Sequence, residues 1–298
     1  MILIILPAYN EAPCIGALLC RIKTVMDTYG FDYQVLVVND GSHDGTPSVV
    51  QEYANRMPIE IINHKLNRGL WETVRDGFEW AAEHCKPDDI IIRMDADDTH
   101  DPKYIPAMVA KIHEGYDVVI ASRFQPGGGT KGLGAYRALV SRCANLVMRL
   151  FFPIKGVRDY SCGYRAYRAE LVQDAIRFFG NAFIDLRGVG FTCTIEKLIK
   201  FRMMGARFAE VPFVLRYDQK LSQSKMLSSI TTLGYFVLIL KYIYPWGETG
   251  KRWQQMIREL HKQKQRQRAV GTEEKSPSPD QRQILNNHSS GNGQPCGA

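Results

Sequence analysis

Five short apolar runs, most of them followed by polar residues, constrain the fold of this chain more than any other feature. The runs are nearly continuous and rich in β-branched residues, which is typical of strands buried on both faces, as in a parallel sheet. They cover Ile2–Leu6, Gln34–Val38, Ile59–Ile62, Asp89–Met94 and Asp117–Ala121. Helical periodicity lies between them, most clearly over Ala12–Tyr29 and Gly69–Cys85. This alternation predicts an α/β fold with a doubly wound, mostly parallel sheet and right-handed crossovers.

Polar clusters follow four of these runs, at the predicted carboxyl ends of the strands. They are Tyr9–Glu11, Asn39–Ser42, Asp95–Asp98 and Ser122–Arg123. Ligands of open α/β sheets bind outside the carboxyl ends of the strands. The four clusters therefore predict one common site.

The cluster after the fourth run has the composition of a divalent-cation site. Three carboxylates so close together repel one another unless a cation or hydrogen bonds compensate. Asp95 and Asp97 lie on the same side of an extended segment, and such hard oxygen ligands suit Mg²⁺ or Mn²⁺. The alternative role is helix capping before Pro102, which we favour for Asp101 only.

The rest of the chain divides into segments of different composition. A glycine-rich loop at 127–134 precedes a predicted helix over 135–152, a second helical stretch lies near 193–205, and 207–215 is strand-like. We therefore expect an α/β domain over 1–226, an apolar and then basic helical segment over 227–268, and a disordered tail over 269–298, rich in Gly, Ser, Pro, Gln and Asn.

Charge and cysteine content narrow the classes of partner and compartment. The net charge is +7, but residues 251–268 alone hold seven basic residues and one acidic residue. A local basic segment without a recognised binding module argues against nucleic-acid binding. The seven cysteines form no CxxC pair, which favours structural thiols in a reducing compartment. The apolar start lacks a basic n-region, so we expect a buried strand there and not a signal peptide.

Seven segments resemble, in order, the family 2 glycosyltransferases of the GT-A fold. The last two resemble the dolichyl- and polyprenyl-phosphate mannose synthases most closely, and the similarity covers about residues 1–226. The segments are LPAYNEA (6–12), VVNDGSHDGT (37–46), LNRGLWETVRDGF (66–78), RMDADDTHDP (93–102), ASRF (121–124), GVRDYSCGYRAYR (156–168) and EVPFVLRYDQKLSQSKM (210–226). The resemblance implies transfer of a hexose, with GDP-mannose as the leading donor, to a polyprenyl phosphate. UDP-glucose or a UDP-N-acetylhexosamine, and a cell-envelope saccharide as acceptor, stay open.

The resemblance also implies which residues hold the donor. The nucleotide-sugar set is Pro7, Tyr9, Glu11, Val38, Asp40, Asp95, Ala96 and Asp97. Asp40 would hydrogen-bond the base, although NDGS also has the composition of a turn. Asp97 would bind the metal, and Asp95 the metal or the ribose. Thr99 stands where the family often has a further metal ligand, frequently Gln.

Cations implied by the resemblance lie on both sides of the reacting centre. Arg216 and Lys225 match the family's late Arg…Ser-Lys pair, which would stabilise the leaving diphosphate, and Lys220 is a rival for Lys225. Their alternative role is a solvated basic loop. The expected catalytic set is Asp95, Asp97, Arg123, Arg216 and Lys225.

The acceptor phosphate is expected to contact Arg123, Arg137 and Ser141. The last two share a helix face at i and i+4, and the alternative is that Arg137 only solvates that face. An ionised phosphate needs no strong general base, which predicts a single in-line displacement with inversion.

Several further polar residues have two possible roles. Asp159 either orients the sugar or a loop, or forms a structural ion pair with Arg165. Glu196 stands at a helical glutamate of the family, and a surface role is an equal alternative. We expect the scattered histidines, among them His64, His84 and His100, at the surface.

The apolar window at 227–246 predicts contact with a membrane. Its uncharged part, 230–240, is short for a span, which takes about 20 residues. The catalytic domain and the basic 251–268 segment both favour the cytoplasmic side, whereas a single span would separate them. We therefore expect a helix lying in the interface at the cytoplasmic face, with Tyr242, Tyr244 and Trp246 at headgroup level. The alternative is a core helix that closes the domain.

Other activities of related chains fit the sequence less well. Processive synthases of the family carry a QxxRW motif, which does not occur here. Sugar-phosphate nucleotidyltransferases carry a GxGxR loop after the first strand, where this chain has YNEAP. An inactive membrane-bound scaffold is disfavoured by the intact Asp95-Ala96-Asp97.

Overall fold

A computed structural model describes residues 1–186, 192–219 and 228–243, together with residues 255, 257–259 and 262. The chain divides into two compact units, Met1–Tyr244 and Pro245–Ala298. The first unit holds every helix and strand discussed below.

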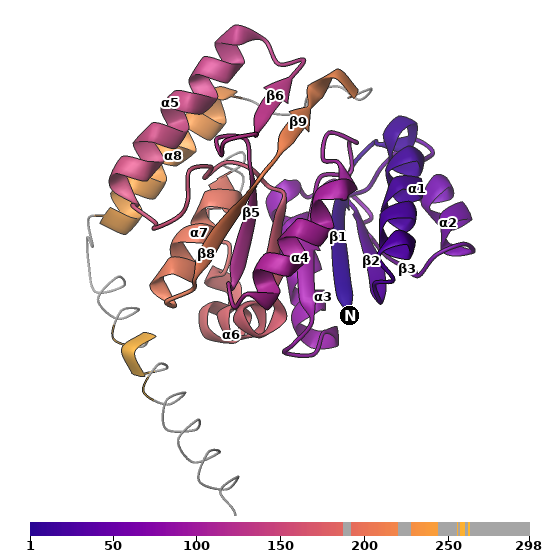
Figure 1. Ribbon diagram of the computed structural model, residues 1–298, viewed down its shortest axis with the longest axis horizontal. Helices are drawn as coiled ribbons and strands as arrows, with labels where there is room; N and C mark the ends of the chain where they lie inside the picture. Colours follow the sequence, from indigo (N-terminus) through magenta and orange to yellow (C-terminus); the bar gives the residue numbers. More distant parts are fainter. Residues whose placement is uncertain (187–191, 220–227, 244–254, 256, 260–261, 263–298) are drawn as a thin grey trace, which may run out of the picture. The chain divides into compact units, whose positions relative to one another are not determined.

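A seven-stranded sheet forms the centre of the first unit, in the order β3-β2-β1-β4-β7-β5-β8 (Figure 1). All neighbouring strands are parallel except around β7, which is antiparallel to both β4 and β5. The strands are β1 (Ile2–Ala8), β2 (Tyr33–Asn39), β3 (Ile59–Asn63), β4 (Ile90–Arg93), β5 (Val118–Ser122), β7 (Arg165–Arg168) and β8 (Phe208–Pro212). The predicted mostly parallel α/β sheet is confirmed.

Four of the five apolar runs form strands that are largely buried, whereas the third forms the edge strand β3, which is half-buried to exposed and not buried on both faces as expected. Every residue of β1 is buried, and Ile2 pairs with Tyr33 of β2 and Ile90 of β4. Full burial of one such aliphatic side chain contributes about 1.5–3 kcal/mol. The burial of these runs therefore fixes the strands close to their predicted bounds.

The described part of the first unit contains eight α-helices, most of which pack on the sheet. They are α1 (Ala12–Thr28), α2 (Thr46–Ala54), α3 (Leu70–His84), α4 (Ile105–His113), α5 (Ala135–Phe151), α6 (Ala169–Phe179), α7 (Thr192–Met203) and α8 (Ser228–Ile243). Helix α3 approaches β1 so closely at Gly77 that a Cβ there would lie 2.7 Å from the Ile5 side chain. This contact brings the start of α3 beside the carboxyl ends of β1 and β2.

Two elements differ from the predicted pattern. The short strand β7 was not expected; it lies between β4 and β5, and its Arg165 side chain is completely buried. The strand-like 207–215 divides at the buried Phe213 into β8 and β9 (Val214–Arg216), and β9 pairs with β6 (Gly129–Lys131) in a separate two-stranded sheet. The chain thus leaves the central sheet toward the glycine-rich loop.

The apolar window forms α8, which packs on α5 and α7 (Figure 1). Leu238 and Ile239 are buried in this packing, whereas Leu233, Phe236 and Leu240 are each about 60% exposed. Across the described residues, no helix combines the length and the apolar character needed to cross a bilayer. Helix α8 therefore closes the domain with one side and exposes apolar side chains on the other.

Candidate active site

The polar clusters after β1 and β2 interlock directly. The Asn10 amide donates to Ser42 Oγ at 2.9 Å, and the His43 amide donates to Asn10 Oδ1 at 2.9 Å. Asn10 has a φ of 52°, a left-handed conformation that asparagine tolerates better than most residues. The Glu11 amide donates to Thr46 Oγ1 at 2.9 Å. The prediction that these two clusters meet is confirmed.

Asp40 ties the loop before α3 to the end of β2. Its Oδ1 accepts from the Arg68 amide at 2.8 Å, and its Oδ2 accepts from the Gly69 amide at 2.9 Å. The Asp40 side chain is nearly buried. The turn alternative fits these contacts, and the predicted bond to a nucleotide base stays a prediction.

His64 is buried against Asp40, so the expectation of a surface histidine was wrong. Its Nδ1 lies 2.8 Å from Asp40 Oδ1, and its Nε2 lies 2.8 Å from Asp76 Oδ2 on α3. The side chain is only 4% exposed. His64 thus links the end of β2 to α3, a role that the sequence alone did not signal.

The aspartates after β4 are held in one orientation by their neighbours. Asp97 Oδ1 accepts from the Thr99 amide at 3.2 Å and from Thr99 Oγ1 at 2.7 Å. Asp95 Oδ1 lies 2.6 Å from Arg93 Nη2. Asp98 adopts a φ of 64° and pairs with Arg21 of α1. The Thr99 hydroxyl therefore orients Asp97, and its predicted role as a metal ligand stays a prediction.

His100 holds the turn that carries these aspartates. Its Nδ1 accepts from the Asp95 amide at 2.9 Å, and its ring stacks on Tyr164 at 5.1 Å between centroids. Burial lowers the pKa of His100 despite the opposite effect of Asp95 and Asp97. His100 is buried and not at the surface as expected, whereas His84 is exposed as expected.

The oxygen atoms of the carboxylates Asp95 and Asp97 are the kind of ligand that Mg²⁺ and Mn²⁺ prefer. Among the described residues, no three side chains of His, Cys, Asp or Glu are grouped as metal ligands. Asp95 and Asp97 therefore present two carboxylates at the end of β4. Asp101 instead caps a short 3₁₀ turn, since its Oδ1 accepts from the Lys103 amide at 3.1 Å, as predicted.

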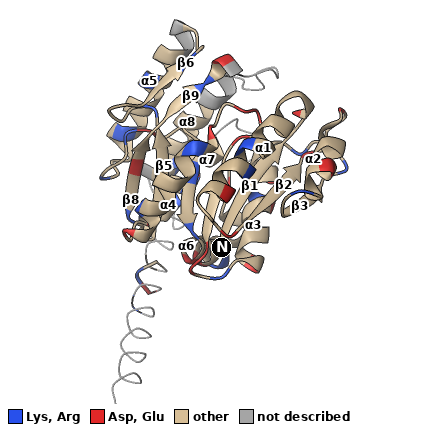
Figure 2. Ribbon diagram, turned by 45° about the vertical axis from the view of Figure 1, so that its right-hand side comes forward, with Lys and Arg blue, Asp and Glu red and all other residues tan. Residues whose placement is uncertain are grey.

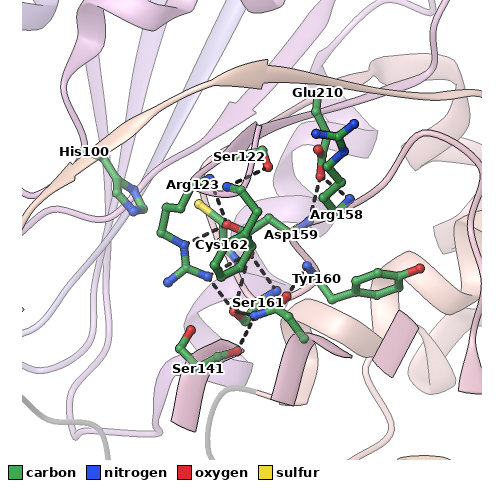
Figure 3. Close-up of polar contacts among 12 residues, drawn as sticks. His100, Ser122, Arg123, Ser141, Arg158, Asp159, Tyr160, Ser161, Cys162 and Glu210 are labelled. Atoms are coloured by element: carbon green, nitrogen blue, oxygen red, sulfur yellow. Dashed lines mark hydrogen bonds and ion pairs between the residues drawn. The ribbon is translucent and has the colours of Figure 1, made fainter. Parts of the chain in front are cut away.

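Arg123 and Asp159 form a buried bidentate ion pair (Figure 3). Arg123 Nε and Nη2 each lie 2.7 Å from an oxygen of Asp159, and Nη2 also donates to Ser161 Oγ at 2.7 Å. Burial alone would raise the pKa of Asp159, but the Arg123 guanidinium holds it below its ordinary value. The pair anchors the segment before β7 to the end of β5.

The alternative ion pair between Asp159 and Arg165 was wrong. Arg165 is fully buried and donates from Nη1 to the Thr194 carbonyl at 2.6 Å and from Nη2 to the Tyr160 carbonyl at 2.7 Å. Arg165 thus joins β7 to α7, and the partner of Asp159 comes from β5 instead.

Of the cations predicted to contact the leaving diphosphate, the structure describes Arg216. Arg216 donates to Asp218 from Nε at 2.9 Å and from Nη2 at 2.8 Å, and this bond raises the pKa of Arg216. The Arg216 amide donates to the Thr99 carbonyl at 3.2 Å, which brings β9 to the aspartate turn. Lys220 and Lys225 lie outside the described residues.

Two of the three expected acceptor residues, Arg137 and Ser141, lie on α5. Asn145 connects this helix to the Arg123 network, since its Nδ2 donates to Ser161 Oγ at 2.9 Å and its Oδ1 accepts from the Tyr160 amide at 2.6 Å. Ser141 is half-buried one turn earlier, and the side chain of Arg137 lies outside the described part of the helix. The helix backbone thus places both positions on the Arg123 side of the fold.

Glu196 is a fully buried hub, which corrects the surface alternative. Its Oε2 accepts from the Asp185 amide at 3.0 Å and the Leu186 amide at 3.1 Å. Its Oε1 accepts from Lys200 Nζ at 3.0 Å and from Tyr242 Oη of α8 at 2.7 Å. One carboxylate thus holds α7, α8 and the 185–186 segment together.

The remaining predicted donor residues line the same strand ends. Pro7, Val38 and Ala96 are largely buried in or just after their strands, Glu11 is buried, and Tyr9 is half-buried. Figure 2 colours the acidic and basic positions of the chain on the ribbon, and several lie in the loops. Sequence reasoning missed His64, His100 and Arg93, although an arginine that ends the apolar IIIR strand was a usable signal.

The sequence of this chain matches a known protein family. The pattern of Glycosyl transferase family 2 matches residues 3–175, more than half of the chain. A dolichol-phosphate mannosyltransferase of Pyrococcus furiosus is 33% identical over 70% of this chain, and the match spans only 55% of that protein. An undecaprenyl-phosphate mannosyltransferase of Micrococcus luteus is 30% identical over 77% of this chain and 88% of its own length.

A solved structure shares the fold. It is a mannosyltransferase of Pyrobaculum calidifontis in complex with GDP-Man and Mn²⁺. It superposes with a TM-score of 0.51 and 18% identity, over 80% of this chain and 64% of the other. The central sheet is thus that of a GT-A-like α/β fold, and the chain belongs to glycosyltransferase family 2.

Proposed function

We propose that this chain is an inverting glycosyltransferase that moves mannose from GDP-mannose to a polyprenyl phosphate. The carrying observation is the aspartate pair Asp95 and Asp97, fixed after β4 beside the interlocked clusters of β1 and β2. The names of the Pyrococcus and Micrococcus relatives support mannose and a polyprenyl-phosphate acceptor.

Asp97 and Asp95 would hold a Mg²⁺ or Mn²⁺ ion, with Thr99 as the third predicted ligand. Mg²⁺ is commonly bound by one or two carboxylates together with substrate phosphates and water, so a two-carboxylate set fits such an ion. When bound, the ion would supply positive charge to the diphosphate oxygens. The oxygen donors and their fixed orientation therefore fit the cofactor predicted from the sequence.

The residues of the chain then bind, orient and stabilise. Pro7, Tyr9, Glu11, Val38 and Asp40 would surround the nucleoside. In the transfer step, an acceptor phosphate oxygen forms a bond to the anomeric carbon while the bond to the diphosphate breaks on the opposite face. Arg216 and Lys225 would stabilise the departing negative charge, which is typically a large catalytic contribution.

The acceptor side would combine a phosphate site with an apolar surface. Arg123, Arg137 and Ser141 would face the lipid phosphate. We define the apolar face as the exposed side chains Leu139, Leu146, Val147, Leu150 and Phe151 of α5 with Leu233, Phe236 and Leu240 of α8. Helices α5 and α8 pack on each other, so these side chains form one surface suited to a membrane interface.

This surface supports the membrane proposal made from the sequence. Helix α8 would lie in the cytoplasmic interface. The expectation that Tyr242 lies at headgroup level was wrong, because its hydroxyl donates to the fully buried Glu196, while Tyr244 and Trp246 lie outside the described residues. The basic 251–268 segment would contact anionic lipid. Carbonate extraction tests the in-plane arrangement, and retention of the protein in the extracted membrane would contradict it.

The transfer reaction tests the proposed function directly. Labelled GDP-mannose is incubated with polyprenyl phosphate and Mn²⁺ or Mg²⁺, and label is measured in the organic extract. We expect label that is lost with EDTA and falls at least about 100-fold in Asp97→Ala, the size typical of losing an electrostatic contact in a transition state. The exposed Asp88→Ala serves as control.

Three outcomes would change the assignment. Label from a UDP-sugar but not from GDP-mannose would replace the donor and leave the acceptor in place. A product with retained anomeric configuration would refute the single displacement. Absence of both nucleotide binding and transfer would favour an inactive scaffold.

A further inference from the structure

A cleft of about 560 Å³ lies where α5 ends, away from the aspartate turn. Its wall is formed by the last turn of α5 and the segment that follows: Arg149, Pro153, Ile154, Lys155, Val157 and Arg158, with Gly156 at the base of a turn. Gly156 has a φ of 84°, and a Cβ there would lie 3.3 Å from the Phe208 carbonyl oxygen. The wall thus follows a tight turn packed against β8.

Positive charge gathers around this cleft. Arg149, Lys155 and Arg158 are all exposed, and no ion pair joins them to a carboxylate within the described residues. The three exposed cations therefore line the cleft together.

The carboxylate beside the cleft is engaged by the backbone. Glu210 Oε1 accepts from the Arg158 amide at 2.6 Å and from the Asp159 amide at 2.7 Å, and Oε2 accepts from Gln125 at 3.0 Å (Figure 3). Burial also raises the pKa of Glu210. Glu210 thus shapes the turn and offsets only part of the charge of the cleft.

The cleft is separate from the predicted acceptor phosphate site. Figure 3 shows Arg123 and Arg158 on opposite sides of Asp159, which pairs with Arg123. Arg123 and Arg158 therefore lie on different sides of the segment that contains Asp159.

The cleft continues the apolar face of α5. Arg142 and Arg149 are seven residues apart, so they lie on one flank of the helix about two turns from each other, beside Leu146 and Leu150. Leu146 and Leu150 are 68% and 75% exposed. Arginines along the flank of an apolar stripe are typical of helices in a lipid interface, because their stems lie on apolar surface while the guanidinium contacts headgroups.

We propose that this cleft binds the phosphate headgroup of an anionic phospholipid, whose acyl chains cover the apolar face. The inference rests on the membrane contact given under Proposed function. Free phosphate shares the headgroup chemistry, but only a lipid uses the cations and the neighbouring apolar surface together. Binding of a headgroup in the cleft would thereby fix which side of α5 faces the bilayer.

Vesicle binding of the full chain tests the proposal. Partition is measured into phosphatidylcholine vesicles with and without phosphatidylglycerol. The cleft variant is Arg149→Gln/Lys155→Gln/Arg158→Gln, and the control Arg56→Gln/Lys86→Gln/Arg177→Gln removes equal charge from exposed positions elsewhere. We expect the cleft variant to lose about tenfold or more of its partition into the anionic vesicles, and the control to stay within about twofold of wild type. An equal loss in both variants would overturn the proposal.

A second measurement separates lipid from free anion. Backbone amide shifts are followed while monomeric dihexanoyl phosphatidylglycerol, dihexanoyl phosphatidylcholine or inorganic phosphate is added. We expect saturable shifts around 149–158 with the anionic lipid only. Equal shifts with inorganic phosphate would overturn the lipid assignment. If the wild type binds vesicles but shows no shifts at the cleft, the cleft is not the lipid site, although the membrane contact stands. If it binds no vesicle, the membrane contact given under Proposed function is refuted as well.

Discussion

His100 illustrates how one buried side chain sets the geometry of the aspartate pair. Asp95 follows the end of β4, and its backbone amide donates to His100 Nδ1 at 2.9 Å. The ring is held from the other side by Tyr164 and by an edge contact with Phe213 at 5.5 Å. The imidazole therefore acts as a fixed acceptor and not as a proton carrier.

We expect His100→Leu to disturb this turn more than His100→Asn does. Leucine leaves a buried amide without its acceptor, which costs about 1–3 kcal/mol, whereas the Asn Oδ1 can occupy the place of Nδ1. Urea unfolding and the Mn²⁺ affinity of both variants, followed by paramagnetic resonance, check this. Equal Mn²⁺ affinity in the two variants would contradict a positioning role for His100.

Lys197 is a second buried residue with a measurable signature. It is 2% exposed on α7, its Nζ lies 4.4 Å from the centre of the Phe78 ring, and burial lowers its pKa to about 7. Between about pH 7 and its ordinary value of 10.5, the unfolded chain binds a proton that the folded chain does not. Stability must therefore rise with pH in that window.

We expect Lys197→Met to remove this pH dependence. Relative to the variant, the free energy of unfolding of the wild type should rise by up to about 1.4 kcal/mol per pH unit above pH 7. Urea unfolding at pH 7 and pH 9 measures the difference, with the exposed Lys86→Met as control. Parallel pH profiles of wild type and Lys197→Met would disprove the buried neutral amine.

At the scale of elements, α8 is attached to the catalytic layer by a few polar contacts as well as by packing. Tyr242 donates to the buried Glu196, and Lys241 pairs with Asp185. Because Glu196 also binds the amides of 185 and 186, the position of α8 is coupled to the segment that precedes α7. A helix with an exposed apolar side is thereby joined to the enzyme core.

We expect Tyr242→Phe to loosen α8. Loss of this hydrogen bond removes a donor from a buried carboxylate, at a cost of about 1–3 kcal/mol. Hydrogen exchange of the α8 amides should become faster in Tyr242→Phe and stay unchanged in the control Tyr235→Phe. Unchanged exchange in Tyr242→Phe would show that packing alone holds the helix.

The strand β7 is the element that completes the site. It lies antiparallel between β4 and β5, so the segment before it passes over the ends of both strands. This path brings Asp159 to Arg123 and Gly163 to Arg93, where a Cβ on the glycine would lie 1.8 Å from Arg93 Nη1. Any side chain at this glycine of the DYSCGYR segment would have to displace the guanidinium of the buried Arg93 from β4.

At the scale of the whole molecule, binding of the donor nucleotide and the metal should increase the stability of the folded protein. A ligand that binds only the folded state raises the free energy of unfolding with its concentration. We expect GDP and Mn²⁺ together to raise the melting temperature more than either alone, because Asp97 would share the ion with the diphosphate. Differential scanning fluorimetry of wild type and Asp97→Asn measures this. A joint shift that survives in Asp97→Asn would refute the assigned ligand.

The sequence by itself determined the layered architecture and the position of the aspartate pair. Apolar runs such as Ile2–Leu6 and Asp89–Met94 need both faces covered, and that requirement is local to each run. The polar residues that follow them must then lie at one edge of the sheet, as Asn10 and Ser42 do. These conclusions depend on periodicity and strand direction alone.

Only the tertiary structure decided the partners. The sequence suggested only Arg165 as an ion-pair partner of Asp159. In the fold Asp159 pairs with Arg123, while Arg165 donates to the Thr194 carbonyl. His64 and His100 looked like surface residues because their partners are backbone amides and carboxylates brought in by folding. Such contacts join residues whose separation depends on how the sheet and helices pack, and no local pattern encodes that packing.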